Sequence, residues 1–143
     1  MALSLSSAGG DSVDVGGMTT PFTVHDGLAV YRLGSGEPVL LFPYPHGSTL
    51  RSMAEDSLAA LLAGLERQVI TFDPPGAYRS TRPMRCDMAE MLACAGEALH
   101  ACRIKLPVDV VGHSMGSLCA LALAIERPEL VRRLVRLVQR MYV

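Results

Sequence analysis

The feature that most constrains this chain is the pentapeptide Gly-His-Ser-Met-Gly at residues 112–116, which lies between two apolar runs. Residues 108–111 are typical of a buried strand, and residues 118–124 of a helix rich in small side chains. A strand and a helix joined by Gly-x-Ser-x-Gly form a turn too tight for side chains at its glycine positions. Such a turn exposes the serine hydroxyl beside the positive end of the helix dipole. The segment therefore predicts that Ser114 is a nucleophile.

Strand and helix patterns alternate along the preceding chain. The apolar runs at residues 38–42 and 69–72 show no polar alternation, which favours parallel strands covered on both faces. Leucines at helical spacing predict a helix over residues 58–65. A second helix is predicted over residues 88–99, where the methionines would pack in the core. This alternation predicts βαβ units joined by right-handed crossovers.

A hairpin precedes these units. Residues 22–25 and 28–33 flank Asp26-Gly27, a dipeptide suited to a two-residue turn. Asp87 stands where the helix over residues 88–99 needs an N-cap, with Glu90 three residues later. The predicted fold class is α/β, a mostly parallel sheet with a leading antiparallel hairpin and flanking helices.

The two ends of the chain are less regular. Residues 1–20 are rich in Ser, Gly and Asp and predict a disordered leader, with one domain over residues 21–143. Residues 131–143 fit two structures. A buried strand would be interrupted by Arg136, whereas a helix would have an apolar stripe opposite its arginines, and periodicity favours the helix.

Composition excludes several classes of function. The net charge of −1 and the lack of a basic block argue against nucleic-acid binding, and no apolar stretch has the length of a membrane span. The histidines and cysteines lack metal-ligand spacing, so we expect no metal site. The cysteines are expected to be free thiols of a cytoplasmic protein (Cys86, Cys94, Cys102 and Cys119).

Two blocks of sequence give the chain a family resemblance over residues 21–138. The first block is the pentapeptide with its flanking strand and helix. The second, Asp-Pro-Pro-Gly-Ala-Tyr-Arg-Ser at residues 73–80, is similar to an Asp-x-x-Gly-x-Gly-x-Ser loop in which Tyr78 replaces the second glycine. The chain resembles the N-terminal half of an α/β-hydrolase of the esterase, lactonase or proline-iminopeptidase type. The resemblance implies no cofactor, a structural role for Asp73, and a nucleophile elbow formed by Gly112, His113, Ser114, Met115 and Gly116.

The resemblance also implies an oxyanion hole with two backbone donors, of which Met115 N–H is one. The second comes from the loop after the strand at residues 38–42. In a gapless alignment Pro45 takes the donor position, and proline has no N–H. Either the loop is shifted, so that Tyr44 or residues 46–48 supply the donor, or the hole is incomplete. We assign the second donor to Tyr44.

The other members of a catalytic triad are harder to place. The family order is nucleophile, then acid, then histidine, yet after Ser114 the sequence holds only Glu126 and Glu129, with no aspartate or histidine. Both glutamates bracket the end of the predicted helix, which is the wrong place for a triad acid. His113 is adjacent to Ser114 and would point elsewhere. His46 is the remaining candidate for a base near the site.

Three hypotheses follow. The first is a serine hydrolase that acts on a small ester, amide or lactone through an acyl-enzyme and is incomplete in this chain. The second is a non-catalytic fragment or interaction module, whose uncovered sheet edge lets copies associate. The third is the product of a frameshift or early stop in an ordinary hydrolase gene.

Overall fold

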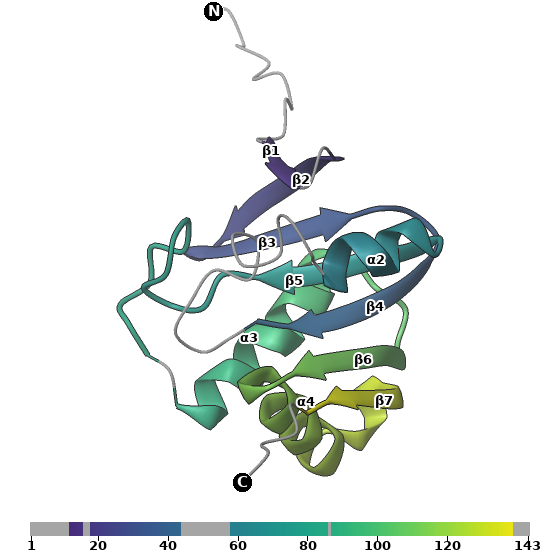
Figure 1. The fold of residues 1–143 in the computed structure, drawn as a ribbon. Coiled ribbons are helices and arrows are strands. Elements are labelled where there is room, and N and C mark those ends of the chain that lie inside the picture. The colour runs from purple at the N-terminus through teal and green to yellow at the C-terminus, as the bar shows by residue number, and fades with distance from the viewer. Residues whose placement is uncertain (1–11, 16–17, 44–57, 86, 139–143) are drawn as a thin grey trace, which may run out of the picture.

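A computed structural model describes residues 12–15, 18–43, 58–85 and 87–138 of the chain. The described elements form one twisted sheet with helices on both faces (Figure 1). In chain order they are β1 (Ser12–Val15), β2 (Met18–His25), β3 (Leu28–Leu33), β4 (Glu37–Phe42), α2 (Leu58–Gly64), β5 (Arg67–Phe72), α3 (Met88–Ala101), β6 (Val108–His113), α4 (Met115–Glu126), the 3₁₀ turn η1 (Pro128–Leu130) and β7 (Val131–Leu137).

The described sheet has the strand order β1-β2-β3-β5-β4-β6-β7. β4 is parallel to both β5 and β6, and β6 is parallel to β7, whereas β1, β2 and β3 join by antiparallel pairing. The predicted fold class is confirmed. Because β4 and β6 are neighbours, their carboxyl ends bring Phe42 and Gly112 into register at one edge of the sheet.

Two apolar layers explain why the central strands show no polar alternation. On one face α3 and α4 pack on alternate strand residues such as Leu40 and Val110. On the other face α2 covers the intervening residues, among them Val39 and Leu41. Each of these four strand residues is fully buried. A strand covered on both faces buries every residue, so the unbroken apolar runs are confirmed as central parallel strands.

The hairpin turn and the helix cap that the sequence predicts are both present in the structure. Asp26 and Gly27 both have positive φ, 46° and 78°, as the tight hairpin turn between β2 and β3 requires. The Asp87 carboxylate accepts the Glu90 N–H at 2.9 Å and caps α3. Met91 is buried as expected, although Met88, at the first turn of α3, stays 40% exposed.

The boundary of the expected N-terminal leader is wrong. β1 pairs antiparallel with β2, and β2 begins at Met18, so residues within the range 1–20 form strands. The Ser-rich and Gly-rich composition concealed them, because Gly and Asp are depleted in strands and clusters of Ser, Gly and Asp indicate loops. Residues 1–11 lie outside the described part of the chain.

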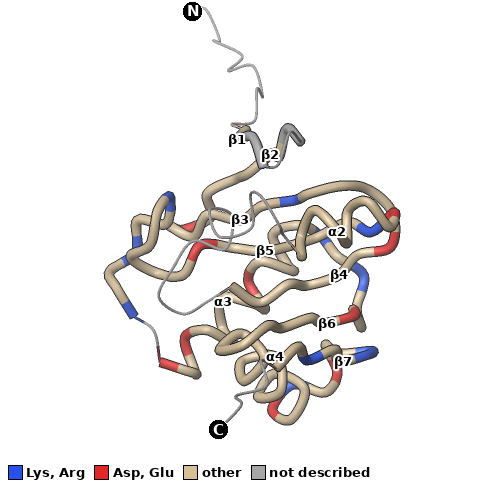
Figure 2. The backbone as a smooth tube through the Cα atoms, viewed as in Figure 1, with Lys and Arg blue, Asp and Glu red and all other residues tan. Residues whose placement is uncertain are grey.

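The expectation of a helix at the C-terminal segment is also wrong. Residues 131–137 form strand β7, with a register shift where β6 meets it at Val108 and Asp109. Arg132 and Arg133 both donate to the Asp109 carboxylate, at 2.9–3.1 Å, as does Arg67 at 2.9 Å. Figure 2 shows these basic and acidic positions gathered at the end of the sheet where β6 and β7 begin. Arg136, the residue that argued against a buried strand, is exposed on β7 and donates to the Ser117 carbonyl at 3.2 Å, so the strand does not bury its charge.

None of the helices in the described part of the chain is long and apolar enough to span a membrane.

Candidate active site

The turn between β6 and α4 has the geometry that the pentapeptide predicts. β6 ends at His113, α4 begins at Met115, and Ser114 between them has φ 54° and ψ −121°. A positive φ is rare for a residue with a side chain and marks a strained position. A Cβ at Gly112 would lie 2.3 Å from the Gly116 carbonyl oxygen, and one at Gly116 would lie 2.9 Å from the Phe42 oxygen. Both glycines are therefore required by close backbone approach.

Three hydrogen bonds hold the backbone of Ser114. Its N–H donates to the Leu137 carbonyl at the end of β7, at 2.9 Å. Its carbonyl accepts the Ser117 N–H at 2.9 Å and the Ser117 hydroxyl at 2.6 Å. Ser114 itself is half-buried. Ser117 and Leu137 could not be predicted from the sequence, because a hydrogen bond from within the helix and a contact from the next strand have no motif of their own.

One of the two predicted oxyanion donors lies in the described part of the chain. Met115 is the first residue of α4, and the N–H groups in the first turn of a helix have no intrahelical acceptor. The loop that should supply the second donor begins at Pro43, directly after the Phe42 carbonyl that touches the elbow. Tyr44, Pro45 and His46 lie outside the described residues, so their roles stay predictions.

Asp73 is buried at the carboxyl end of β5 and holds the loop that follows it. Its Oδ2 accepts the Tyr31 hydroxyl and the Arg79 N–H, and its carbonyl accepts the Ser80 hydroxyl at 2.6 Å. Burial raises the pKa of the Asp73 carboxyl and also that of the Tyr31 phenol. These contacts with the loop over residues 74–80 fit the structural role that the resemblance implies for Asp73. Tyr78, at the second glycine position of the motif, has φ 44°.

The described acidic residues that follow Ser114 do not reach it. Glu126 ends α4, and Glu129 in η1 pairs with Arg127 at 2.6 Å. Because α4 has 12 residues and a helix rises about 1.5 Å per residue, its end is roughly 18 Å from Ser114. The expectation that neither glutamate is a triad acid agrees with this distance.

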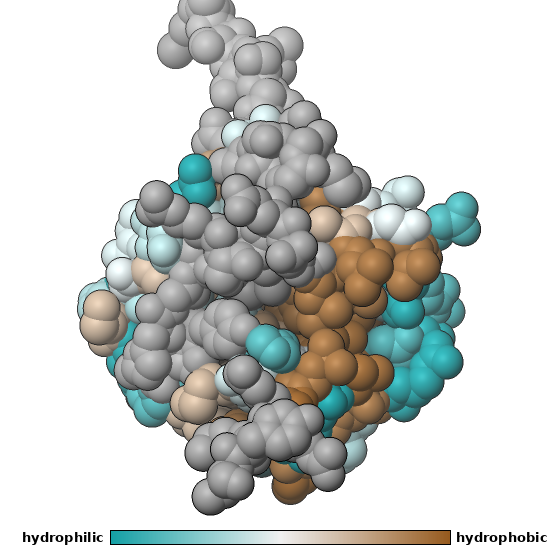
Figure 3. Space-filling view, in the orientation of Figure 1, coloured by the Kyte–Doolittle hydropathy of each residue, from teal (hydrophilic) through white to brown (hydrophobic). Residues whose placement is uncertain are grey.

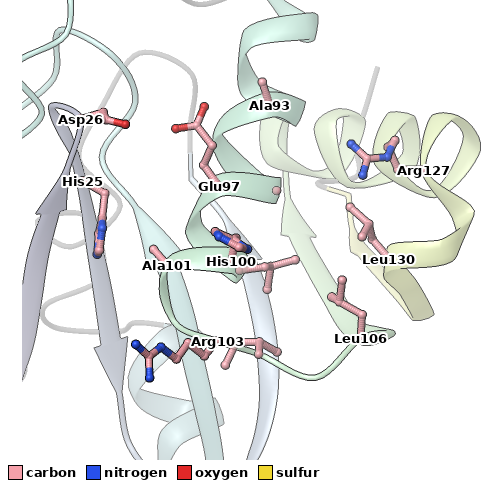
Figure 4. Close-up of a pocket in the computed structure, with 13 residues that line it drawn as sticks. His25, Asp26, Ala93, Glu97, His100, Ala101, Arg103, Leu106, Arg127 and Leu130 are labelled. Atoms are coloured by element: carbon pink, nitrogen blue, oxygen red, sulfur yellow. The ribbon is translucent and has the colours of Figure 1, made fainter.

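Two recesses hold the described histidines. His113 lines an open recess of about 600 Å³ with Arg136, Leu137 and Val138, beside the elbow. A larger recess lies along α3, where Glu97 and His100 project between the hairpin turn that carries His25 and the end of α4 (Figure 4). The second recess does not include the elbow. Among the described residues, no three His, Cys, Asp or Glu side chains form a group that could hold a metal ion.

Comparison with known proteins agrees with this geometry. A family model described as the alpha/beta hydrolase fold matches residues 38–141. The chain belongs to the alpha/beta hydrolase fold family. The matched range contains β4 to β7 together with α2, α3, α4 and the elbow, so it covers the parallel part of the sheet and the candidate site.

Three individual relatives share between a quarter and a third of their aligned residues with the chain. The chain is 31% identical over 105 residues to (E)-2-((N-methylformamido)methylene)succinate hydrolase of Acinetobacter baylyi, covering 73% of this chain and 38% of that protein. Rv0554 of Mycobacterium tuberculosis is 30% identical with a TM-score of 0.63, covering 76% of this chain and 39% of Rv0554. An epoxide hydrolase of an endophytic Streptomyces is 25% identical with a TM-score of 0.62, covering 84% and 37%. The chain thus spans about two fifths of the length of these relatives.

Proposed function

We propose that this chain carries the nucleophilic half of a serine hydrolase that acts on a small ester, amide or lactone. The observation that carries the proposal is the backbone of Ser114, which has positive φ between two glycines that tolerate no side chain. A strained serine at the start of a helix is the arrangement that presents a hydroxyl to an acyl carbon. The family supplies the broader class, since the A. baylyi relative is named as a hydrolase.

The proposed reaction has two steps. Ser114 Oγ bonds to the acyl carbon, and the leaving alcohol or amine departs with the proton that the serine loses. Water then adds to the acyl-enzyme, which releases the acid and restores the hydroxyl. In both steps the oxyanion would accept the Met115 N–H and a second N–H, which we assign to Tyr44.

Proton transfer is the step that the described residues do not complete. A serine without its base is a weak nucleophile near neutral pH. An oxyanion hole and substrate binding alone retain roughly 10³–10⁴-fold catalysis over water. We therefore expect slow acylation by this chain, with His46 as the candidate base within the sequence, and still slower release of the acid.

An acyl-trapping experiment tests this proposal. The chain would be incubated with p-nitrophenyl acetate, denatured, and digested for mass spectrometry. We expect one acetyl group on the peptide that contains Ser114, absent from Ser114→Ala and present in Ser35→Ala, a control at an exposed serine in the turn before β4. Acetylation of Ser114→Ala at the same rate and level as the parent would overturn the proposal.

A second candidate function rests on β7. This strand is the last in the described sheet, and Val135, Leu137 and Val138 are 47%, 40% and 67% exposed. Figure 3 shows a broad hydrophobic area on the face that carries α2. An unpaired strand edge flanked by apolar side chains pairs readily with another chain. The alternative function is therefore an interaction module in which copies of the chain associate. A mass in solution above that of one chain would support this alternative.

We further infer a cytoplasmic location. The supporting observation is that Cys94, Cys102 and Cys119 are buried free thiols, as expected in a reducing compartment.

A further inference from the structure

The three arginines of β7 differ in how their charge is balanced. Arg132 and Arg133 share the Asp109 carboxylate, and Arg132 also reaches Glu37 at 3.0 Å. Arg136 forms no ion pair within the described residues. Its Nε donates to the Ser117 carbonyl at 3.2 Å, and within the described residues the terminal nitrogens of the guanidinium have no carboxylate partner.

This unbalanced charge lies beside the candidate nucleophile. Arg136 is in register with Gly112, the first glycine of the elbow, and the carbonyl it bonds to lies in the first turn of α4. The next residue, Leu137, accepts the Ser114 N–H. Arg136 and Leu137 line the same open recess as His113 and Val138. The recess therefore combines a cationic group with two apolar side chains next to the elbow.

We propose that Arg136 determines substrate choice by binding a carboxylate on the acyl group that Ser114 attacks. The inference rests on the proposed function. A guanidinium presents paired N–H donors that match the two oxygens of a carboxylate, and hydrogen bonds between charged groups are stronger than neutral ones. Leu137 and Val138 offer apolar surface to the methylene groups between the carboxylate and the reacting carbonyl. The substrate class is then a half-ester or half-amide of a small dicarboxylic acid.

The kinetic test compares two esters that differ only in the distal group. The p-nitrophenyl monoester of glutaric acid carries the carboxylate, and p-nitrophenyl pentanoate has a neutral chain of the same length. We expect Ser114 to be acylated faster by the acidic ester, and Arg136→Gln to reduce that preference by roughly 10-fold to 100-fold. Arg136→Lys should retain part of it. Arg32→Gln, which removes an exposed guanidinium in β3, should leave it unchanged.

A binding measurement separates this inference from the proposed function. Glutarate would be titrated into the Ser114→Ala variant with and without Arg136→Gln, following the amide resonances of Gly116 and Leu137. We expect saturable shifts that Arg136→Gln weakens by at least tenfold. If glutarate binds in this way but neither ester acylates Ser114, the carboxylate site stands and the proposed function fails. Equal acylation by both esters in the parent and in Arg136→Gln would overturn the carboxylate site alone. Absence of both binding and acylation would overturn both.

Discussion

At the scale of single residues, the elbow depends on backbone contacts rather than on side-chain packing. Ser114 has positive φ because the two glycines around it allow β6, α4 and the end of β4 to approach within contact distance. The neighbours that a new Cβ would meet at Gly112 are the carbonyl of Gly116 and the Cα of Ser117. Backbone atoms inside a packed turn cannot move aside as a flexible side chain can.

Gly112→Ala should therefore destabilise the fold. A Cβ at 2.3 Å from the Gly116 oxygen forces the backbone apart, and we expect a loss of at least about 2 kcal/mol in the free energy of unfolding. Urea unfolding measures this change. The control is Gly96→Ala in α3, where nothing lies within 4 Å, and there alanine should stabilise by about 0.5–1 kcal/mol. An equal, small effect of both substitutions would contradict the tight turn.

Tyr78→Gly should stabilise the chain. Tyr78 has φ 44° and is 56% exposed, so its ring contributes little packing while its Cβ strains the backbone. We expect the free energy of unfolding of Tyr78→Gly to be about 1 kcal/mol higher than that of Tyr78→Ala, because alanine removes the ring but keeps the Cβ. Thermal or urea unfolding measures the difference. If alanine and glycine were equivalent, the strain at this position would be refuted.

At the scale of elements, strand β7 is stabilised by ion pairs between its arginines and a carboxylate of β6. The Asp109 carboxylate is 8% exposed and accepts hydrogen bonds from Arg67, Arg132 and Arg133. The hydrogen bonds from Arg132, followed by those from Arg133 and Arg67, hold the pKa of this carboxyl below its usual range. Without it, two arginines of β7 would repel each other and Arg67 at the sheet's end.

Asp109→Asn should loosen β7. Removing the charge leaves Arg67 and Arg133 without their counter-charge and Arg132 with Glu37 alone, and we expect a loss of about 2–4 kcal/mol in stability with faster amide exchange in β7. Asp87→Asn is the control, because asparagine also caps helices well and β7 exchange should not change. A variant in which β7 amides exchange as slowly as in the parent would contradict the role of Asp109.

The same contact predicts a pH dependence. Folding lowers the pKa of the Asp109 carboxyl below its ordinary value of 3.8. The ionised carboxylate therefore contributes its full stabilisation above pH 3.8, and this contribution is lost as the pH falls from 3.8 toward the pKa of the folded state. The parent should lose this contribution on acidification, whereas Asp109→Asn should lack it. Urea unfolding across pH 2 to 6 spans the pH range of this loss, and parallel curves of unfolding free energy against pH for the two proteins would refute it.

How far the sequence predicts the structure depends on how local each signal is. The elbow, the turn at Asp26-Gly27 and the Asp87 cap follow from adjacent residues, and the structure has all three. β7 does not, since the sequence shows Arg136 interrupting an apolar run but not that the segment is a largely exposed strand. Nor does it show that Arg132 pairs with the Asp109 carboxylate, 23 residues earlier. The place of Arg136 beside the elbow equally depends on the pairing of β6 with β7, which no local pattern shows.

At the scale of the whole molecule, the chain is a parallel sheet that ends at β7 in its described part. It spans about two fifths of the length of the family members it matches. Val135 and Leu137 of β7 are exposed, and Figure 3 shows an apolar area on the face that carries α2. We expect the outer edge of β7 to determine whether copies of the chain associate.

Val135→Lys should reduce self-association. The parent should increase in mass with concentration in light scattering, because β7 offers unpaired backbone and apolar side chains to another copy. A lysine on the edge strand opposes such pairing, so the variant should remain monomeric. Ile125→Lys, at a residue of helix α4 that is 69% exposed and away from the strand edge, should associate as the parent does. A parent that is monomeric at all concentrations would contradict the interaction module.

The central claim is that the elbow makes Ser114 a nucleophile, and covalent labelling with a fluorophosphonate probe tests it most directly. The folded parent should carry one phosphonyl group on Ser114, and Ser114→Ala should carry none, whereas unfolding the parent in urea should abolish labelling. Equal labelling of the parent and Ser114→Ala, or labelling that persists in the unfolded chain, would contradict the claim.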